Sequence, residues 1–288
     1  MDRPIREIYS GWKRIYDSVG REPPGGSLAL SDTDEFTLAD SYTLADDLTF
    51  ERSNPDSVWR CFAMARENAR QMRNSISADM WTSLNLAYLR IQDLGIQDIW
   101  RAPESFYVET LSEINTFTGV AAFTMYRDDG WHFLQLGRSM ERSQLLTSLL
   151  LAQMVAEATS GERVEDDWAT LLRAYHATET YNRKHSVEVI ADQVLDLLVS
   201  DSMLPRSLRR SIDQMTAELR GLKPGPDPAS NAAVRRAEIR LNNLVNPDSP
   251  TQGNRGALLR RVNERCRELH QLLAASHFDY HLEKQSAG

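Results

Sequence analysis

The segment from Phe133 to Met154 constrains the fold more than any other part of the chain. Its apolar residues step by three and four, as one stripe of a helix requires. The stripe consists of Phe133, Leu136, Met140, Ser143, Thr147, Leu150 and Met154, and the other faces carry Leu134, Leu145, Leu146, Leu149 and Leu151. Because a helix that is apolar all round is buried, the pattern predicts a long helix inside a multi-helix core.

A second segment, Asn54 to Tyr88, predicts two helices with a sharp joint. Asn54 and Pro55 are typical of a helix start. One apolar stripe then follows, formed by Val58, Phe62, Ala65, Ala69, Met72 and Ile76. Ser77 predicts the N-cap of the next helix, which runs through Trp81 to Tyr88.

The same period of about 3.6 residues recurs along the rest of the chain. Further helices are predicted over 2–20, 36–48, 103–125, 168–175, 181–199, 205–219, 232–245 and 257–281. The alternating pattern of a strand is scarce, so the predicted fold class is all-α, a multi-helix bundle without a sheet. The predicted core includes Trp12, Phe62, Met72, Phe133, Leu145 and Leu149.

A Pro/Gly-rich segment at 223–228 is the best boundary within the chain. It divides a bundle over 1–222 from C-terminal helices over 229–288. We expect those helices to pack on the same bundle, and a single compact domain is the alternative.

Composition limits the functional classes. The formal charge of −8 argues against nucleic-acid binding. Cys61 and Cys266 are the only cysteines, which fits a reducing compartment. No apolar signal region opens the chain and no apolar stretch is long enough to cross a bilayer, so we expect a cytoplasmic protein with no membrane partner. Homo-oligomer formation stays open.

Two groups of charged residues lie on the predicted helices. The first group is a row of arginines beside the apolar stripe of 58–76, namely Arg66, Arg70 and Arg73, with Glu67 one turn before Arg70. The second group lies near the N-terminal end of the apolar helix over 133–154 and consists of Arg138, Glu141 and Arg142. An exposed face with an i,i+3 ion pair is the commoner interpretation of the first row. However, charges on a buried helix need partners, so we expect both groups to meet in one central Glu/Arg polar pocket.

The two long segments resemble the alpha-E family of bacterial all-helical proteins. The resemblance is carried by NPDSVWRCFAMARENARQMRNSIS with Trp81, Leu84 and Asn85 following, and by TM-R-D-GW-FL-LGR-ER from Thr124 to Arg142. Weaker matches are Tyr181 to Arg183 and Pro205 to Leu208. The resemblance implies a helical domain beside, or fused to, an ATP-grasp ligase-like protein that makes or modifies peptide amide bonds. ATP and Mg would then act only through that partner, and this chain would hold no cofactor.

Two positions depart from the family pattern. Family members usually open with a helix that carries another ER-A-EN-AR cluster, and no such segment precedes Asp2. An Arg usually follows the Glu of the second motif by one or two turns, where this chain has Ser148. Part of the presumed pocket is therefore expected to be missing.

The candidate site residues have distinct expected roles. Glu67 and Glu141 are candidate general bases. The candidate anion-binding residues are Arg66, Arg70, Arg73, Arg127, Arg138, Arg142 and Arg183, and the supporting residues are Ser77, Trp81, Asn85, Tyr181 and Arg206. No nucleotide-binding loop, nucleophile elbow or Glu-x-x-His motif occurs. His270, His277 and His281 have a spacing that zinc accepts but no convincing carboxylate beside them, so no metal site is predicted.

Three functional hypotheses follow. The first is a partner domain of an ATP-grasp amide-forming system that binds an anionic peptide or small-molecule substrate. The second is an enzyme in its own right, in which a pocket Glu acts as base and the arginines stabilise an anion. The third is a scaffold whose ion pairs only fix the register of the helices. A carboxylate with a raised pKa would favour the enzyme. Arginines without an ion pair would favour the binding domain, whereas arginines that are all engaged in internal ion pairs would favour the scaffold.

Overall fold

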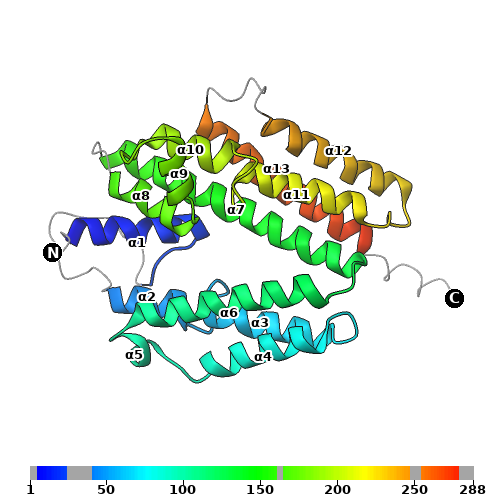
Figure 1. Cartoon of the computed structure of the whole chain (residues 1–288), viewed down its shortest axis with the longest axis horizontal. Helices are drawn as coiled ribbons and strands as arrows, with labels where there is room; N and C mark the ends of the chain where they lie inside the picture. The colour runs from blue at the N-terminus through cyan, green and yellow to red at the C-terminus, as the bar shows by residue number, and fades with distance from the viewer. Residues whose placement is uncertain (1–4, 25–40, 161–164, 247–253, 279–288) are drawn as a thin grey trace. The chain divides into compact units, whose positions relative to one another are not determined.

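The computed structural model describes residues 5–24, 41–160, 165–246 and 254–278 (Figure 1). Within these ranges the chain forms thirteen helices and no strand. The all-α fold class is therefore confirmed.

The chain divides into two compact units. Unit 1 combines residues 1–19 with 132–288, and unit 2 consists of residues 20–131. Unit 2 is thus inserted between the first helix of unit 1 and the remainder of unit 1. The helices on both sides of the predicted 223–228 boundary belong to unit 1.

Unit 2 is built around three helices that pack side by side. Its elements are α2 (Ser41–Thr49), α3 (Val58–Gln71), α4 (Ala78–Ile91), α5 (Ile96–Ile99) and α6 (Pro103–Thr124). Helix α4 packs on both α3 and α6. Apolar side chains from all of them form its core, namely Leu44, Phe62, Met80, Leu84, Ile91, Ile96 and Phe106.

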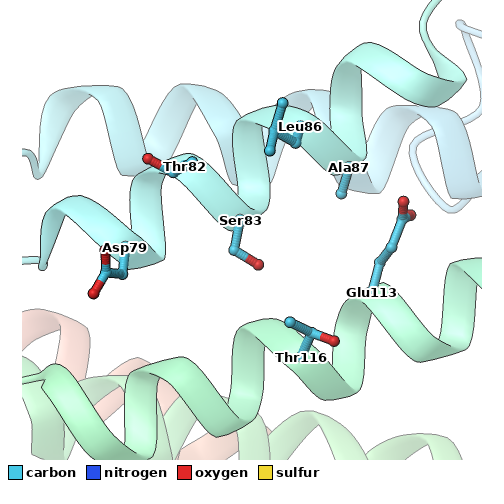
Figure 2. Close-up of a pocket in the computed structure, with 7 residues that line it drawn as sticks. All are labelled: Asp79, Thr82, Ser83, Leu86, Ala87, Glu113 and Thr116. Atoms are coloured by element: carbon cyan, nitrogen blue, oxygen red, sulfur yellow. The ribbon is translucent and has the colours of Figure 1, made fainter.

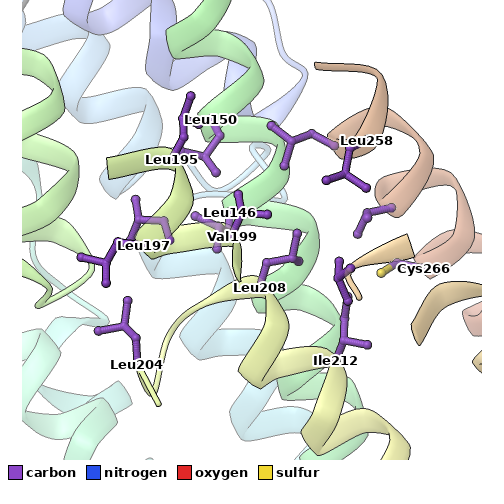
Figure 3. Close-up of a cluster of buried hydrophobic side chains, with 14 of the residues drawn as sticks. Leu146, Leu150, Leu195, Leu197, Val199, Leu204, Leu208, Ile212, Leu258 and Cys266 are labelled. Carbon is purple, nitrogen blue, oxygen red and sulfur yellow. The ribbon is translucent and has the colours of Figure 1, made fainter. Parts of the chain in front are cut away.

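Unit 1 holds the larger core. Its elements are α1 (Ile5–Val19), most of α7 (Asp129–Ser160), α8 (Glu165–Ala174), α9 (Thr178–Lys184), α10 (Ala191–Ser200), α11 (Leu208–Gly221), α12 (Pro228–Leu244) and α13 (Arg255–His277). Figure 3 shows how Leu146 and Leu150 of α7 meet Leu195 and Leu197 of α10 and Leu258 of α13 in this core. Helix α1 ends at Gly20, whose φ of 69° allows the chain to turn away.

The buried face of α7 is partly polar. Ser139, Ser143 and Thr147 follow one another at every fourth position and are fully buried. The hydroxyl of Ser143 donates to the carbonyl of Ser139 at 2.9 Å, and that of Thr147 donates to the carbonyl of Ser143 at 2.9 Å. The hydroxyls of Ser143 and Thr147 are therefore satisfied within the helix itself, whereas the buried hydroxyl of Ser139 has no hydrogen-bond partner among the described residues.

Several predicted helix boundaries are wrong. The N-cap of α3 is Ser57, whose hydroxyl accepts from the amide of Arg60, whereas Asn54 is buried in the preceding loop, where its side chain bonds Asp47 and Asp56. The single helix predicted over 181–199 is in fact two helices, α9 and α10. Helix α11 begins after its N-cap Ser207, and α12 begins after its N-cap Asp227. Helix α13 begins at Arg255, and the short helix α5 was not predicted. The predicted residues 2–4, 36–40 and 279–281 lie outside the described ranges.

The predicted core is only partly correct. Phe62 is buried, Trp12, Phe133 and Leu149 are half-buried, but Met72 and Leu145 are 52% and 48% exposed. Met72 is the C-cap residue of α3, where the stripe leaves the helix. Leu145 lies on the opposite face of α7 from Ser139, Ser143 and Thr147, so α7 is not buried on every side.

Candidate anion-binding site

Unit 1 contains a group of three arginines and one tyrosine that come from three helices. Arg138 and Arg142 lie one turn apart on α7, so their side chains share one face. Arg206 lies one residue before the N-cap of α11, and Tyr175 directly follows α8. Arg138, Arg142, Arg206 and Tyr175 are called the arginine cluster below.

The backbone holds Tyr175 at the end of α8. The amide of Ala177 donates to the carbonyl of Leu172 at 2.8 Å, and that of His176 donates to Arg173 at 3.1 Å. The backbone of His176 has a φ of 52°, which lies in the left-handed region. This pattern is a Schellman motif, which ends the helix and fixes the direction of the chain at Tyr175.

Hydrogen bonds around Asp201 hold the segment that carries Arg206. The carboxylate of Asp201 accepts from the amides of Met203 and Leu204, and its carbonyl accepts from the hydroxyl of Ser207. The side chain of Lys184 forms an ion pair with the same carboxylate. Because these donors occupy Asp201, the nearest acidic residue in sequence is already engaged and Arg206 is left without it.

The members of the arginine cluster influence one another electrostatically. Partial burial lowers the pKa of Arg138, and repulsion from Arg206 lowers it further. Partial burial also lowers the pKa of Arg142, with additional repulsion from Arg138 and Arg206. Burial raises the pKa of Tyr175 to about 12, although Arg206 and Arg142 oppose that rise. The tyrosine is therefore a neutral hydroxyl at pH 7, and the arginines remain cations.

No carboxylate neutralises these arginines within the described residues. Among those residues, neither a hydrogen bond nor an ion pair engages the side chains of Arg138, Arg142 or Arg206. Three like charges are thus held together at a cost that an anion would relieve. Guanidinium forks and a tyrosine hydroxyl suit the oxygens of a carboxylate or phosphate.

Other predicted residues of unit 1 lie in different surroundings. Glu141 is exposed on α7 and Arg183 is exposed on α9. Tyr181 is buried, and its hydroxyl bonds the carbonyl of Glu188, the amide of Ile190 and Oε1 of Gln193, each at 2.9 Å. The tyrosine thereby closes the loop between α9 and α10, so its hydroxyl is fully used in holding the fold.

In unit 2 two of the predicted arginines, Arg66 and Arg70, donate hydrogen bonds to neighbouring side chains. Arg70 donates to both carboxylate oxygens of Glu67, at 2.8 and 2.7 Å, and both residues are largely exposed. Hydrogen bonds from Arg70 and Gln71 lower the pKa of Glu67 to about 2. Arg66 donates from Nε to Oδ1 of Asn85 at 2.7 Å. The i,i+3 ion pair expected from the sequence is therefore present.

The remaining predicted residues of unit 2 have structural contacts of their own. Ser77 caps α4 by accepting from the amide of Met80, as predicted, and bonds Thr124 at 2.7 Å. Arg127 donates to the carbonyl of Ala122 and lies 3.5 Å from the ring centre of Trp131.

The expected meeting of the two charge groups stays a prediction. Glu67 and Arg70 belong to unit 2, whereas Arg138, Glu141 and Arg142 belong to unit 1. Tyr175, which the sequence analysis missed, joins the second group through tertiary structure alone. It belongs to no motif and to no apolar stripe that reaches the site.

A pocket of about 350 Å³ lies between α4 and α6 of unit 2, and Figure 2 shows the residues that line it. Asp79, Leu86 and Ala87 of α4 line it together with Glu113 and Thr116 of α6. Its lining carries carboxylates and no cationic side chain, so it does not suit an anion. None of the predicted site residues lines it.

The described residues hold neither a cluster of metal ligands nor a membrane-spanning helix. Within the described part of the chain, no group of three or more His, Cys, Asp and Glu side chains could hold a metal ion. His281 lies outside that part. None of the described helices combines the length and the hydropathy that crossing a membrane requires.

The chain is 26% identical over 212 residues to uncharacterized proteins of Mycobacterium bovis and Mycobacterium tuberculosis. The match covers 71% of this chain but only 23% of each relative's length. No solved structure matches. Residues 7–278 match the Alpha-E family, described as a predicted alpha-helical domain with a conserved ER motif. Four Glu-Arg dipeptides occur in the chain, and the one at Glu141–Arg142 adjoins the arginine cluster. The chain belongs to the Alpha-E family.

Proposed function

We propose that this chain is a binding domain that holds an anionic group of a peptide or small-molecule substrate at the arginine cluster. The observation that carries the proposal is the absence of any carboxylate engaging Arg138, Arg142 or Arg206 within the described residues. Uncompensated like charges destabilise a folded protein unless a ligand uses them. A carboxylate or phosphate would accept hydrogen bonds from the guanidinium forks and from the hydroxyl of Tyr175.

The same proposal includes a partner of the ATP-grasp ligase type, which would supply ATP and Mg and form or modify an amide bond. The family resemblance suggests this class of partner. The matched segment makes up less than a quarter of each mycobacterial relative. This supports a helical domain that works within a larger polypeptide. The partner therefore rests on the family resemblance, and the anion site rests on the arginine cluster.

An enzyme with Glu67 as general base is the second hypothesis, and the surroundings of Glu67 favour binding over catalysis. A general base works best when its pKa lies near the working pH. The ion pair with Arg70 lowers the pKa of Glu67 to about 2, which makes this carboxylate a weak base at neutral pH. Glu141, the other candidate base, has no such pair and stays a candidate.

The experiment measures anion binding directly. Thermal unfolding of the full chain is followed in chloride and in added phosphate or citrate, each at the same ionic strength. Arg142→Gln and Arg206→Gln should abolish most of the stabilisation that the added anion gives. Arg210→Gln is the matched control, because Arg210 is an exposed arginine of α11 whose side chain makes no ion pair within the described residues.

Two results would contradict the proposal. The first is equal stabilisation of the wild-type chain and both cluster variants, and the second is no stabilisation by any anion. The partner is tested separately, by co-purifying the chain with an ATP-grasp-type protein from a genome that encodes the two side by side. Failure of co-purification would remove the partner and leave the anion site.

A further inference from the structure

Arginines and aromatic rings of α3, α4 and the turns before and after α3 form a row of successive contacts in unit 2. The guanidinium carbon of Arg52 lies 4.7 Å from the ring centre of Trp59, and the rings of Trp59 and Tyr88 are 6.1 Å apart. Arg66 lies 5.0 Å from the ring centre of Tyr88 and 5.6 Å from that of Trp81, and Arg73 lies 4.6 Å from that of Trp81. This continuous row, called the arginine–aromatic ladder below, contains Arg52, Trp59, Tyr88, Arg66, Trp81 and Arg73.

The rings hold the ladder guanidinium groups by cation–π contacts, and most of the guanidinium nitrogens stay available for a ligand. Arg66 uses only Nε, which donates to Asn85. Arg52 makes one long contact, 3.5 Å from Nη2 to the carbonyl of Gln92. No hydrogen bond or ion pair occupies the guanidinium nitrogens of Arg73 within the described residues. A guanidinium already held against a ring loses less freedom when it binds a carboxylate.

The charge of the ladder stands out against its own unit. Residues 20–131 contain 9 arginines and no lysine against 18 acidic residues, a formal charge of −9. None of the three ladder arginines forms an ion pair within the described residues. The neighbouring Arg70, in contrast, is paired with Glu67. The ladder is therefore a local row of positive charge on an acidic unit.

We propose that the arginine–aromatic ladder is a docking surface for an extended acidic segment of a partner protein. Arg66 and Arg73 both stack on Trp81, which keeps their guanidinium carbons within about 10 Å of each other. Carboxylates on alternate residues of an extended chain are about 7 Å apart, so flexible Glu side chains reach both arginines. The apolar rings between the arginines provide a surface for the aliphatic parts of the segment.

The surroundings favour a short acidic peptide over other anions. A long polyanion such as a nucleic acid would be repelled by the acidic remainder of unit 2. A single small anion would engage one arginine and leave the others unused, since Arg52, Arg66 and Arg73 are spread along α3 and the turns before and after it. This inference goes beyond the proposed function because it concerns other residues and another kind of ligand.

The test uses the full chain and a synthetic peptide, acetyl-(Glu-Ser)5-amide, at low ionic strength. Binding is measured by calorimetry and by tryptophan fluorescence, which Trp81 should report. Arg66→Gln and Arg73→Gln should each weaken binding about tenfold, as expected for the loss of a hydrogen bond to a charged group. Arg73→Lys, which keeps the charge but not the plane, should lie between that variant and the wild type.

A matched control separates the ladder from charge alone. Arg101→Gln removes an exposed arginine of the same unit that is not part of the ladder, and it should change the affinity by less than about twofold. Circular dichroism melting of each variant shows whether α3 and α4 stay folded. The peptide acetyl-(Gln-Ser)5-amide should not bind.

The outcomes are distinct. Peptide binding that Arg66→Gln and Arg73→Gln weaken while Arg101→Gln does not supports the docking surface. The docking surface would be overturned if the Glu peptide does not bind, or if the Gln peptide binds equally well. It would also be overturned if all three variants weaken binding equally, or if free glutamate or polyphosphate saturates the site instead of the peptide. Arg66→Gln and Arg73→Gln should weaken peptide binding more than Arg142→Gln and Arg206→Gln do. A loss confined to Arg142→Gln and Arg206→Gln would refute the ladder and leave the proposed function standing.

Discussion

Arg66 donates from Nε to Oδ1 of Asn85 across 2.7 Å, and the same guanidinium lies between the rings of Tyr88 and Trp81. A neutral amide therefore orients this cation without neutralising it. An acidic residue at position 85 would hold the arginine equally well but would use up its charge. Because residue 85 is Asn and not Asp, Arg66 is oriented by a hydrogen bond while its charge stays available for a ligand.

Asn85→Asp should weaken binding of the acidic peptide while the fold stays intact. The new carboxylate forms an ion pair with Arg66 and repels the Glu side chains of the peptide. We expect a loss of affinity of about tenfold and an unchanged or slightly higher melting temperature. Thr82→Asp adds the same charge at an exposed position of α4, and it should have a smaller effect.

The two leucines at positions 145 and 146 should differ sharply in their contribution to stability. Leu146 is fully buried in the core of unit 1, whereas Leu145 is 48% exposed. Leu146→Ala should cost about 2–5 kcal/mol because it opens a cavity. Leu145→Ala should cost less than about 1 kcal/mol. Urea unfolding measures both, and equal losses would contradict the burial described for α7.

The carboxylate of Glu67 should titrate far below the usual range of glutamate. Hydrogen bonds from Arg70 and Gln71 lower its folded pKa to about 2, against an unfolded value near 4.5. Because the folded pKa is depressed, the ion pair favours the folded state above pH 4.5, and this contribution fades as the pH falls toward 2. Carbon NMR of the Glu67 carboxyl should show the low midpoint, and Arg70→Gln should raise it. A midpoint near 4.5 in the wild-type chain would disprove the pairing.

Removing one member of the arginine cluster should not destabilise the chain in chloride buffer. Arg138 and Arg142 repel each other one turn apart on α7, and both repel Arg206. Arg142→Gln should therefore leave the free energy of unfolding unchanged or raise it by about 0.5 kcal/mol. Denaturant titration measures the change. A loss above about 1 kcal/mol would mean that Arg142 has a structural partner after all.

The two cysteines should differ in reactivity. Burial raises the pKa of the Cys266 thiol to about 12, and this side chain is fully covered, whereas Cys61 is exposed. Since only a thiolate reacts, a disulfide reagent at pH 8 should modify one thiol per native chain and the second only after unfolding. Rapid modification of both thiols would show that the core around α13 opens easily. Cys61→Ser should abolish the fast reaction.

Sequence patterns predicted the helical fold well because helices are local. The period of the apolar residues located α3, α4 and α7, and the chemistry of Ser77 located the start of α4. The start of α3 was misplaced because Asn54 and Ser57 are both good caps. Only tertiary structure, in which Asn54 bonds Asp47, decides between them.

The candidate site was less predictable, since its members are brought together by contacts that no periodicity encodes. The break between α9 and α10 depends on the hydroxyl of Tyr181, which bonds backbone groups seven and nine residues later. Tyr175 reaches the arginine cluster from the end of α8, and no sequence pattern marks it. Whether Arg66 and Arg142 carry free or paired guanidinium groups is likewise a property of three-dimensional neighbours.

The insertion of unit 2 between α1 and α7 sets an order for folding during synthesis. Unit 2 is continuous in sequence, so all of its contacts are available once residue 131 has left the ribosome. Helix α1 emerges earlier, but Arg14 pairs with Asp167 and bonds Gln153, more than 130 residues downstream. The first helix made is therefore among the last to be locked in place. A chaperone that shields its Trp12 and Tyr16 face would act in the interval between the completion of unit 2 and the arrival of α8.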